Sequence, residues 1–491
     1  MTLPSDAPNS YWPSILFGGI AVLLLLIASI LFFGREETEQ IATPAVMAEP
    51  PDGNHERPLD LSDSELEAIH SDWLPEWALS RVGQIHGEPT RTRDQLLESL
   101  QNAPVLHDIV RSLETSSDDP KTTSSDEILP LCWTWNQYLD EHDRPWRIRC
   151  NMVVREDERW FYITGYQVLA DVQVDVEDTP QRVRLLRRMD RTGAREPYLG
   201  HAGTQSEGAL LVLDRIRDFA MNSVWPLMDP EFDDLQNEFT RALAPEIRLE
   251  LTRSLSVEHL TNLRRTAGIR LEMVEIWNEM EPIRRCRGLE QLRLSWWGVS
   301  PESLMPLVNE SEEEHQNCPN ASPDDLGRLL QLTEDLAMEA ELLPALDHIL
   351  AWTAHPIIVH EARHLADRTT DGSDGPPCPG CSRPLSAAER SELSAYLSTL
   401  THPSLSNLSR LQACEALSSL PTESIHAQAL QELQRQGLEN MCSEAIPDFI
   451  NRSQAAMARL LGRSPFTTMS IDFPRRLPVT LGPPPAQNPT P

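Results

Sequence analysis

Polar and apolar residues alternate with a period of two in several short stretches between residues 132 and 189. These stretches are residues 147–154, 160–166, 172–176 and 182–185. Such alternation is typical of strands that bury one face. The pattern predicts a small antiparallel β meander in this part of the chain.

Most of the remaining body has apolar residues at helical spacing. Helical signals begin at Ser62 and Glu65, which stand in capping-box spacing, and continue to about Leu113. Residues 205–350 are almost wholly helical in pattern, and helical stretches recur to about Leu461. We therefore predict an α+β protein that is mainly α, with a small antiparallel β region.

Turn-rich and proline-rich stretches divide this pattern into segments. The predicted organisation is a short N-terminal segment (1–14), a transmembrane anchor (15–34), an acidic proline-containing linker (35–60), a helical segment (61–125), an antiparallel β-rich region (126–204), a helical domain with the candidate site (205–463) and a proline-rich tail (464–491).

The predicted anchor is an uncharged apolar run over residues 15–33. About 20 apolar residues span a hydrocarbon core of roughly 30 Å, so the run predicts a single-pass membrane helix. Residues 1–14 contain no Lys or Arg and Arg35 follows the run, a slight charge difference that favours the body inside. Charge alone leaves the orientation open.

The eight cysteines favour the opposite orientation. An even number with little metal-site spacing is typical of an oxidising compartment, and proximity predicts disulfides between sequential cysteines. We expect the main body to be extracytoplasmic, although an enzyme with free thiols that faces the cytosol remains an alternative. The predicted pairs are Cys132–Cys150, Cys286–Cys318, Cys378–Cys381 and Cys414–Cys442.

The net charge of −33 excludes non-specific nucleic-acid binding through a basic surface. It also argues against adhesion to an anionic membrane beyond the anchor itself. The charge therefore predicts no nucleic-acid partner. The membrane that holds the N-terminal helix is an expected partner, and anchoring there suggests a protein or peptide substrate near the envelope.

The sequence His360-Glu361-Ala362-Arg363-His364 carries the strongest chemical signal. On a helix, His360 and His364 lie one turn apart on the same face, so both imidazoles can reach one metal ion. Glu361 follows the first of them directly, where its carboxylate can take a proton from a metal-bound water. The preceding Pro356 predicts a helix start, whereas Arg363 is a charge at a position where zinc-peptidase helices usually have none.

A third ligand is expected on the next predicted helix, residues 386–400. Ser386 and Glu389 have capping-box spacing, which assigns Glu389 to the helix end. Glu392 has no such role and shares a helix face with Ala395 and Tyr396, and a small residue beside a carboxylate lets two helices approach closely. We predict that His360, His364 and Glu392 bind Zn²⁺.

These residues resemble the gluzincin type of zinc metallopeptidase, in which H-E-x-x-H on one helix is completed by a glutamate on a later helix, often within E-x-x-A. The resemblance covers about residues 356–400. It implies a zincin-like helical core, with His360, His364 and Glu392 as ligands and Glu361 as general base. The glycine and third histidine of metzincins are absent. Asp367, Glu389 and Glu415 remain alternatives for the third ligand, with Asp367 expected to accept a hydrogen bond from a ligand imidazole.

The resemblance implies hydrolysis of peptide bonds, for which the oxyanion needs a donor besides zinc. Tyr396, His402 and Arg363 are candidates, and Tyr396 is our first choice as a second catalytic residue. The alternative function is a non-catalytic envelope scaffold or interaction protein, with a helical body joined by disulfides. The β region could form a substrate-binding sheet edge, but its distance along the chain from His360 favours a separate scaffold domain.

Overall fold

The computed structural model describes residues 60–464 with gaps at 82–88, 156–157, 178, 191–198, 203–207, 236–237, 254, 288–293, 295–297, 300, 309–317, 338, 340–341 and 443–447. The predicted N-terminal segment, anchor and most of the linker lie outside this range, as does the tail from residue 465. None of the helices within it has the length and apolar character needed to cross a bilayer.

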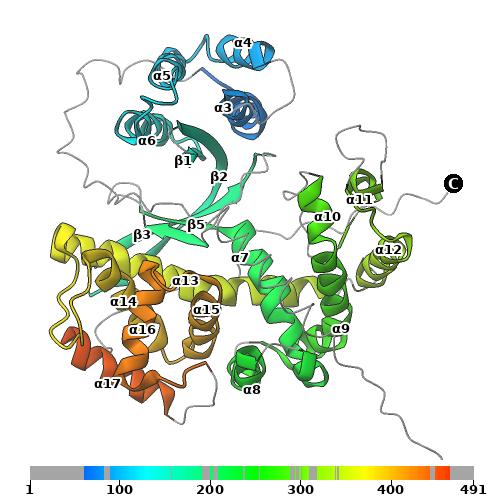
Figure 1. Ribbon diagram of the computed structural model, residues 1–491, viewed down its shortest axis with the longest axis vertical. Helices are drawn as coiled ribbons and strands as arrows, with labels where there is room; N and C mark the ends of the chain where they lie inside the picture. The colour runs from blue at the N-terminus through cyan, green and yellow to red at the C-terminus, as the bar shows by residue number, and fades with distance from the viewer. Residues whose placement is uncertain are drawn as a thin grey trace, which may run out of the picture.

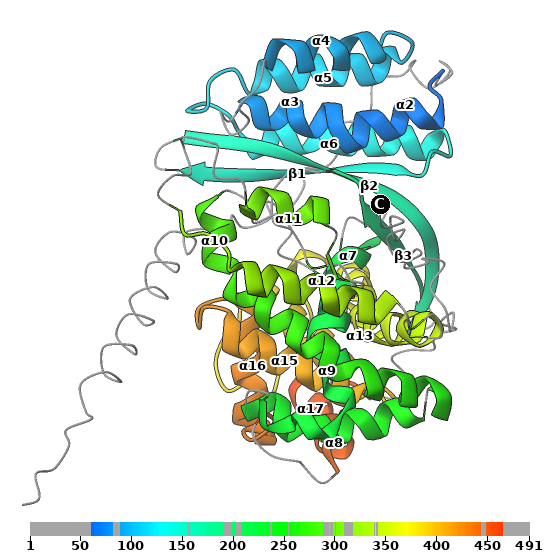
Figure 2. The ribbon, with the colours of Figure 1, turned by 90° about the vertical axis from the view of Figure 1, so that its right-hand side faces the viewer.

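The molecule is built in layers around one sheet (Figure 1, Figure 2). An N-terminal helical layer covers one part of the sheet, and a larger helical body covers another. The N-terminal layer contains α2 (Asp63–Ala68), α3 (Leu74–Arg81), α4 (Pro89–Ser99), α5 (Pro104–Ser116) and α6 (Ser125–Glu141). The larger body contains α7 (Leu213–Phe219), α8 (Glu238–Thr252), α9 (Val257–Glu279), α10 (Glu281–Cys286), α11 (Pro301–Val308), α12 (Pro323–Ala337), α13 (Leu343–Asp371), α14 (Ala387–Leu400), α15 (Ser406–Ser419), α16 (Ile425–Leu433) and α17 (Phe449–Leu461).

The sheet has the strand order β1-β2-β3-β5-β4 and is mixed, because β3 pairs with β5 in parallel while the other pairs are antiparallel. The prediction of a purely antiparallel region is therefore wrong at one strand pair. The strands are β1 (Trp146–Arg155), β2 (Glu158–Val176), β3 (Thr179–Arg188), β4 (Gly200–Ala202) and β5 (Ala209–Val212).

Other element boundaries also differ from the sequence prediction. The stretches 160–166 and 172–176 belong to one long strand, β2, whose register shifts between Val168 and Ala170. Such an irregularity bends a strand without ending it, and β2 curves from the N-terminal layer toward α13 (Figure 2). Residues 209–212 form β5 instead of helix, and Cys132 lies on α6 instead of in the β region.

The sheet shares a hydrophobic core with the motif helix. Side chains of β2, β3 and β5 pack with Leu350, Ile358 and Leu365 of α13 in a single cluster. The sheet is therefore joined to α13 instead of forming the separate scaffold domain that we favoured. Sequence distance was a poor guide here, because β5 leads directly into α7 and brings the chain back to α13.

The predicted disulfides are all confirmed: Cys132–Cys150, Cys286–Cys318, Cys378–Cys381 and Cys414–Cys442. Each bond links cysteines that are neighbours in the cysteine order of the chain. They join segments that local folding already places side by side, which is why proximity predicted them.

Candidate metal centre

The motif lies in the second half of α13, a long helix that is buried over much of its length. The predicted start at Pro356 is wrong, because α13 begins at Leu343 and Pro356 lies inside it. An interior proline removes one helical hydrogen bond and usually ends or kinks a helix. Here α13 continues because apolar residues pack it on both sides of the proline, as with Ile349 and Ile358.

His360 and His364 lie next to each other on one face of α13. Their ring centroids are 4.8 Å apart, and their Nε2 atoms are 3.1 Å apart. The helix thus places two imidazole nitrogens at one point in space, as the one-turn spacing predicts.

Glu392 of α14 meets both imidazoles. Its Oε2 atom is 3.2 Å from His360 Nε2, and its Oε1 atom is 3.3 Å from His364 Nε2. The possible ligand atoms of these three residues lie within 4.8 Å of one another. In the part of the chain that the structure describes, this is the only such group of His, Cys, Asp or Glu side chains.

Local sequence explains how α14 presents Glu392. Ser386 and Glu389 form the predicted capping box, which fixes where the helix begins. Ser394 and Ala395 are fully buried and small, and the distance between packed helices depends on the size of the side chains at their contact. Together the cap and the small residues allow α14 to approach α13 at the level of Glu392.

Tyr396 and His426 are further side chains that lie close to Glu392 and His360. The Tyr396 ring lies 4.9 Å from the His360 ring, and the Tyr396 hydroxyl is 3.3 Å from His426 Nδ1. His426, at the start of α16, also places Nδ1 3.0 Å from Glu392 Oε2. Three helices therefore converge on one carboxylate.

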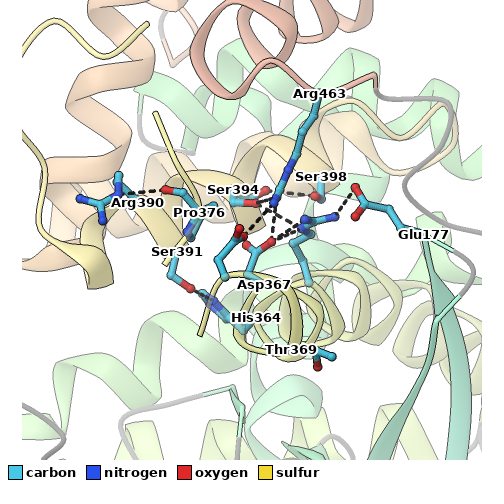
Figure 3. A network of polar contacts seen from close by, with 12 residues as sticks. Glu177, His364, Asp367, Thr369, Pro376, Arg390, Ser391, Ser394, Ser398 and Arg463 are labelled. Carbon is cyan, nitrogen blue, oxygen red and sulfur yellow. Dashed lines mark hydrogen bonds and ion pairs between the residues drawn. The ribbon is translucent and has the colours of Figure 1, made fainter. Parts of the chain in front are cut away.

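The hydrogen-bond partner of the His364 imidazole at Nδ1 is Ser391, not Asp367 as predicted. Ser391 Oγ lies 2.7 Å from His364 Nδ1 (Figure 3). A hydrogen bond at Nδ1 orients the ring and leaves Nε2 directed toward Glu392. Ser391 precedes Glu392 on α14, so the same helix carries the carboxylate and the group that orients its neighbour.

Glu361 is buried, with 7% of its surface exposed, and lies against β4, the last strand in the order of the described sheet. A Cβ atom on Gly200 would lie 2.8 Å from both Cγ and Oε1 of Glu361. The absence of a side chain at Gly200 thus lets the sheet edge lie directly against this carboxylate.

The surroundings shift the pKa values of Glu361 and Glu392 in opposite directions. Burial raises the pKa of Glu361, and the nearby His360 and His364 oppose this only in part. Burial acts in the same direction on Glu392, but the histidines around it outweigh that effect and hold its pKa well below the usual range. Glu392 is therefore an anion, while Glu361 is the more basic carboxylate.

Burial, together with the negative charges of Glu392 and Glu361, raises the pKa of Tyr396 well above its usual value. Its hydroxyl consequently keeps its proton at neutral pH and can donate a hydrogen bond. Tyr396 therefore offers a hydrogen-bond donor beside His360 and Glu392.

The other two proposed donors lie elsewhere. Arg363 is fully buried and directs its guanidinium toward Asp367, Ser394 and Glu177. The His402 ring lies 5.7 Å from that of His355, and burial lowers the pKa of His402. Neither side chain is part of the cluster around Glu392.

The carboxylates that were alternatives for the third ligand form hydrogen bonds elsewhere. Asp367 accepts hydrogen bonds from Arg363 and Arg463. Glu389 accepts from the Ser386 backbone at 2.6 Å, in the predicted capping role. Glu415 is hydrogen bonded to Ser223, and burial raises its pKa to about 7. Among these carboxylates, the fold brings only Glu392 to the histidines.

Sequence reasoning missed His426, Ser391 and Gly200. His426 begins a helix capped by Ser424, which is a visible signal, but nothing local indicates that this helix end faces Glu392. Ser391 and Gly200 carry no chemical signature of their own. Their roles follow from which segments pack together.

No protein-family model matches the chain, and neither a curated protein nor a solved structure matches it.

Proposed function

We propose that this protein is a zinc-dependent metallopeptidase in which His360, His364 and Glu392 bind the metal and Glu361 is the general base. The observation that carries the proposal is the convergence of these three ligand atoms beside a buried carboxylate. The resemblance to gluzincins supports the same assignment at the level of the motif.

The donor set fits zinc in chemistry and size. Two imidazole nitrogens and one carboxylate oxygen are a common ligand set of catalytic zinc. Ligand atoms about 2.0–2.1 Å from a tetrahedral zinc ion lie roughly 3.4 Å from one another. The two Nε2 atoms are 3.1 Å apart, close to that value, and they lie 3.2 and 3.3 Å from the two different oxygens of Glu392.

Zinc bound at such a site polarises a carbonyl group and lowers the pKa of water. Glu361 accepts the proton of the attacking water and passes it to the leaving amine, a role that its raised pKa favours. The neutral Tyr396 hydroxyl donates a hydrogen bond to the developing oxyanion.

A peptide is the substrate class that the surroundings favour. β4 is the last strand in the order of the described sheet, and its Gly200 lies against Glu361. An extended peptide can add to a sheet edge through main-chain hydrogen bonds. Such a peptide would carry its carbonyl groups past the general base. With the apolar run at residues 15–33 as an anchor, we propose a membrane-bound enzyme that acts outside the cytoplasm.

Metal content and hydrolysis of the full chain test this proposal together. We expect one tightly bound zinc per chain, which His360→Ala and Glu392→Ala lose. The matched control is Glu389→Ala, which removes the same charge one turn earlier on α14 and keeps the metal. Glu361→Gln should retain zinc while kcat on a peptide library falls by roughly 10²–10⁴-fold.

The results also separate the two function classes. Full activity in Glu361→Gln would exclude the proposed base. A folded wild-type chain that binds no zinc would make His360 and His364 structural residues and favour the scaffold function. Zinc binding without hydrolysis of any peptide would leave a structural metal site.

A further inference from the structure

Behind the candidate metal centre, α13 carries a buried ion-pair cluster. Arg363 and Asp367 have side chains that are 0% and 1% exposed, and they flank His364 in the sequence. Arg363 Nε donates to Asp367 Oδ1 at 2.8 Å, and Arg363 Nη1 donates to Glu177 Oε1 at 3.0 Å. Glu177 follows directly after β2, so the Arg363 guanidinium joins the motif helix to the sheet.

A second arginine reaches the cluster from the end of α17. Arg463 Nη1 donates to Asp367 Oδ1 at 2.7 Å, and Arg463 Nη2 donates to Asp371 Oδ2 at 3.0 Å. The side chain of Arg463 is 14% exposed, and Gly462, in the left-handed conformation, ends the helix just before it. The Arg463 side chain thus reaches α13 from the end of α17.

Both arginines also bind α14. Arg363 Nε lies 3.2 Å and Arg463 Nη1 lies 3.1 Å from Ser394 Oγ. On α14, Ser394 lies two residues after Glu392. On α13, Arg363 directly precedes His364 and Asp367 follows it by three residues. The cluster therefore connects the helix that carries the histidines to the helix that carries the glutamate.

We propose that Arg363, Asp367 and Arg463 are positioning residues that hold α13 and α14 at the separation required for metal binding. The proposal rests on the proposed function of the centre. It assigns Arg363, the charge that is unusual for a zinc-peptidase helix, to a clamp between the two ligand helices. In this proposal Arg463, just after α17, also helps to position the ligand helices.

The physical reason is the high cost of leaving any member of the cluster unpaired. Removing one partner of a buried ion pair leaves an uncompensated charge, so the helices would shift or admit water. Ligand distances in zinc sites lie within about 0.2 Å of standard values. A small movement of α14 relative to α13 therefore weakens metal binding even though no ligand is altered.

Arg463→Ala in the full chain is the most direct test, because Arg463 is the most exposed of the three residues and lies outside both ligand helices. We expect its affinity for Zn²⁺, measured by competition with a chromophoric chelator, to fall roughly 10-fold, the lower end of the range for direct hydrogen-bond partners of metal ligands, because Arg463 acts through Asp367 and Ser394. Arg463→Lys keeps the charge but not the forked donor group and should restore part of the affinity. Arg459→Ala is the matched control, since this exposed arginine, one turn earlier on α17, bonds to the Gln436 carbonyl and should leave the affinity unchanged.

A spectroscopic measurement separates positioning from general loss of stability. With Co²⁺ in place of Zn²⁺, the visible absorption bands report ligand geometry, and we expect them to shift in Arg463→Ala but not in Arg459→Ala. If wild type binds Zn²⁺ and Arg463→Ala has the same affinity and the same Co²⁺ spectrum, the clamp is wrong and the metal centre stands. If wild type itself binds neither ion, the proposed function fails, and the clamp fails with it.

Discussion

Arg363 is interpreted differently from the sequence and from the structure. In the motif it is a charge at a position that usually lacks one, which weakens the resemblance to zinc peptidases. In the fold its side chain is fully buried and paired with Asp367 and Glu177. Its hydrogen bonds go to Asp367, Ser394 and Glu177, so the guanidinium is not part of the cluster formed by His360, His364 and Glu392.

Gly200 is the residue whose substitution should separate metal binding from catalysis. In Gly200→Ala the new Cβ would lie 2.8 Å from Glu361 Cγ, so the carboxylate must move. Misplacing a catalytic group by about 1 Å can cost up to roughly 100-fold in rate. We expect kcat to fall by about 10- to 100-fold while zinc content stays at one per chain.

Kinetics and elemental analysis on the same samples measure both quantities. Gly327→Ala is the matched control, because a Cβ at Gly327 of α12 would meet no atom within 4 Å. Unchanged kcat in Gly200→Ala would show that contact with the sheet edge does not position Glu361.

Among the helices, α15 depends on a carboxylate from a distant helix. Leu405, which precedes α15, provides no side-chain cap. Glu250 of α8 replaces it, since its Oε2 accepts a hydrogen bond from the Asn407 backbone at 2.9 Å. Burial raises the pKa of Glu250 to about 7, against the lowering effect of Asn407.

This raised pKa predicts how stability depends on pH. A carboxyl group whose pKa is higher in the folded state favours folding at low pH, and this contribution is lost as pH rises toward 7. Glu250→Gln imitates the protonated group, so it should have little effect at pH 5. At pH 8 it should raise the free energy of unfolding by up to the order of 3 kcal/mol. Urea denaturation at both pH values measures this, and an equal effect at pH 5 and pH 8 would contradict it.

At the scale of the whole molecule, β2 passes through two separate cores. Phe161 and Ile163 pack with the N-terminal helices, whereas Val172 and Val174 pack with α13. The motif helix α13 packs in the second of these cores, and the Cys132–Cys150 disulfide lies in the first. Stability of the N-terminal layer and metal binding should therefore respond to different substitutions.

Replacing both Cys132 and Cys150 with alanine tests this separation. The bond closes a loop with a sequence separation of 18, and a disulfide of that size contributes about 3 kcal/mol in the chain-entropy model. We expect the N-terminal layer to unfold at a lower denaturant concentration while zinc affinity stays the same. A parallel loss of zinc affinity would show that the layers are energetically coupled.

Much of this protein can be predicted from local sequence. Helix caps such as Ser386 with Glu389, the period-two alternation of the strands and the pairing of neighbouring cysteines are all short-range features. The spacing of His360 and His364 is of the same kind, because one helical turn determines it. These features need no knowledge of which distant segments meet.

By itself, the sequence thus determined the helical and β-rich regions, the disulfide pairs and the side chains that converge as candidate ligands. Only the tertiary structure decided that β5 is parallel to β3, that Arg463 reaches Asp367, and that Gly200 and His426 border the centre. The physical reason is that backbone periodicity and capping act within a few residues. Pairing of buried charges and close backbone approach depend on segments that lie far apart in the chain, and packing alone brings those together.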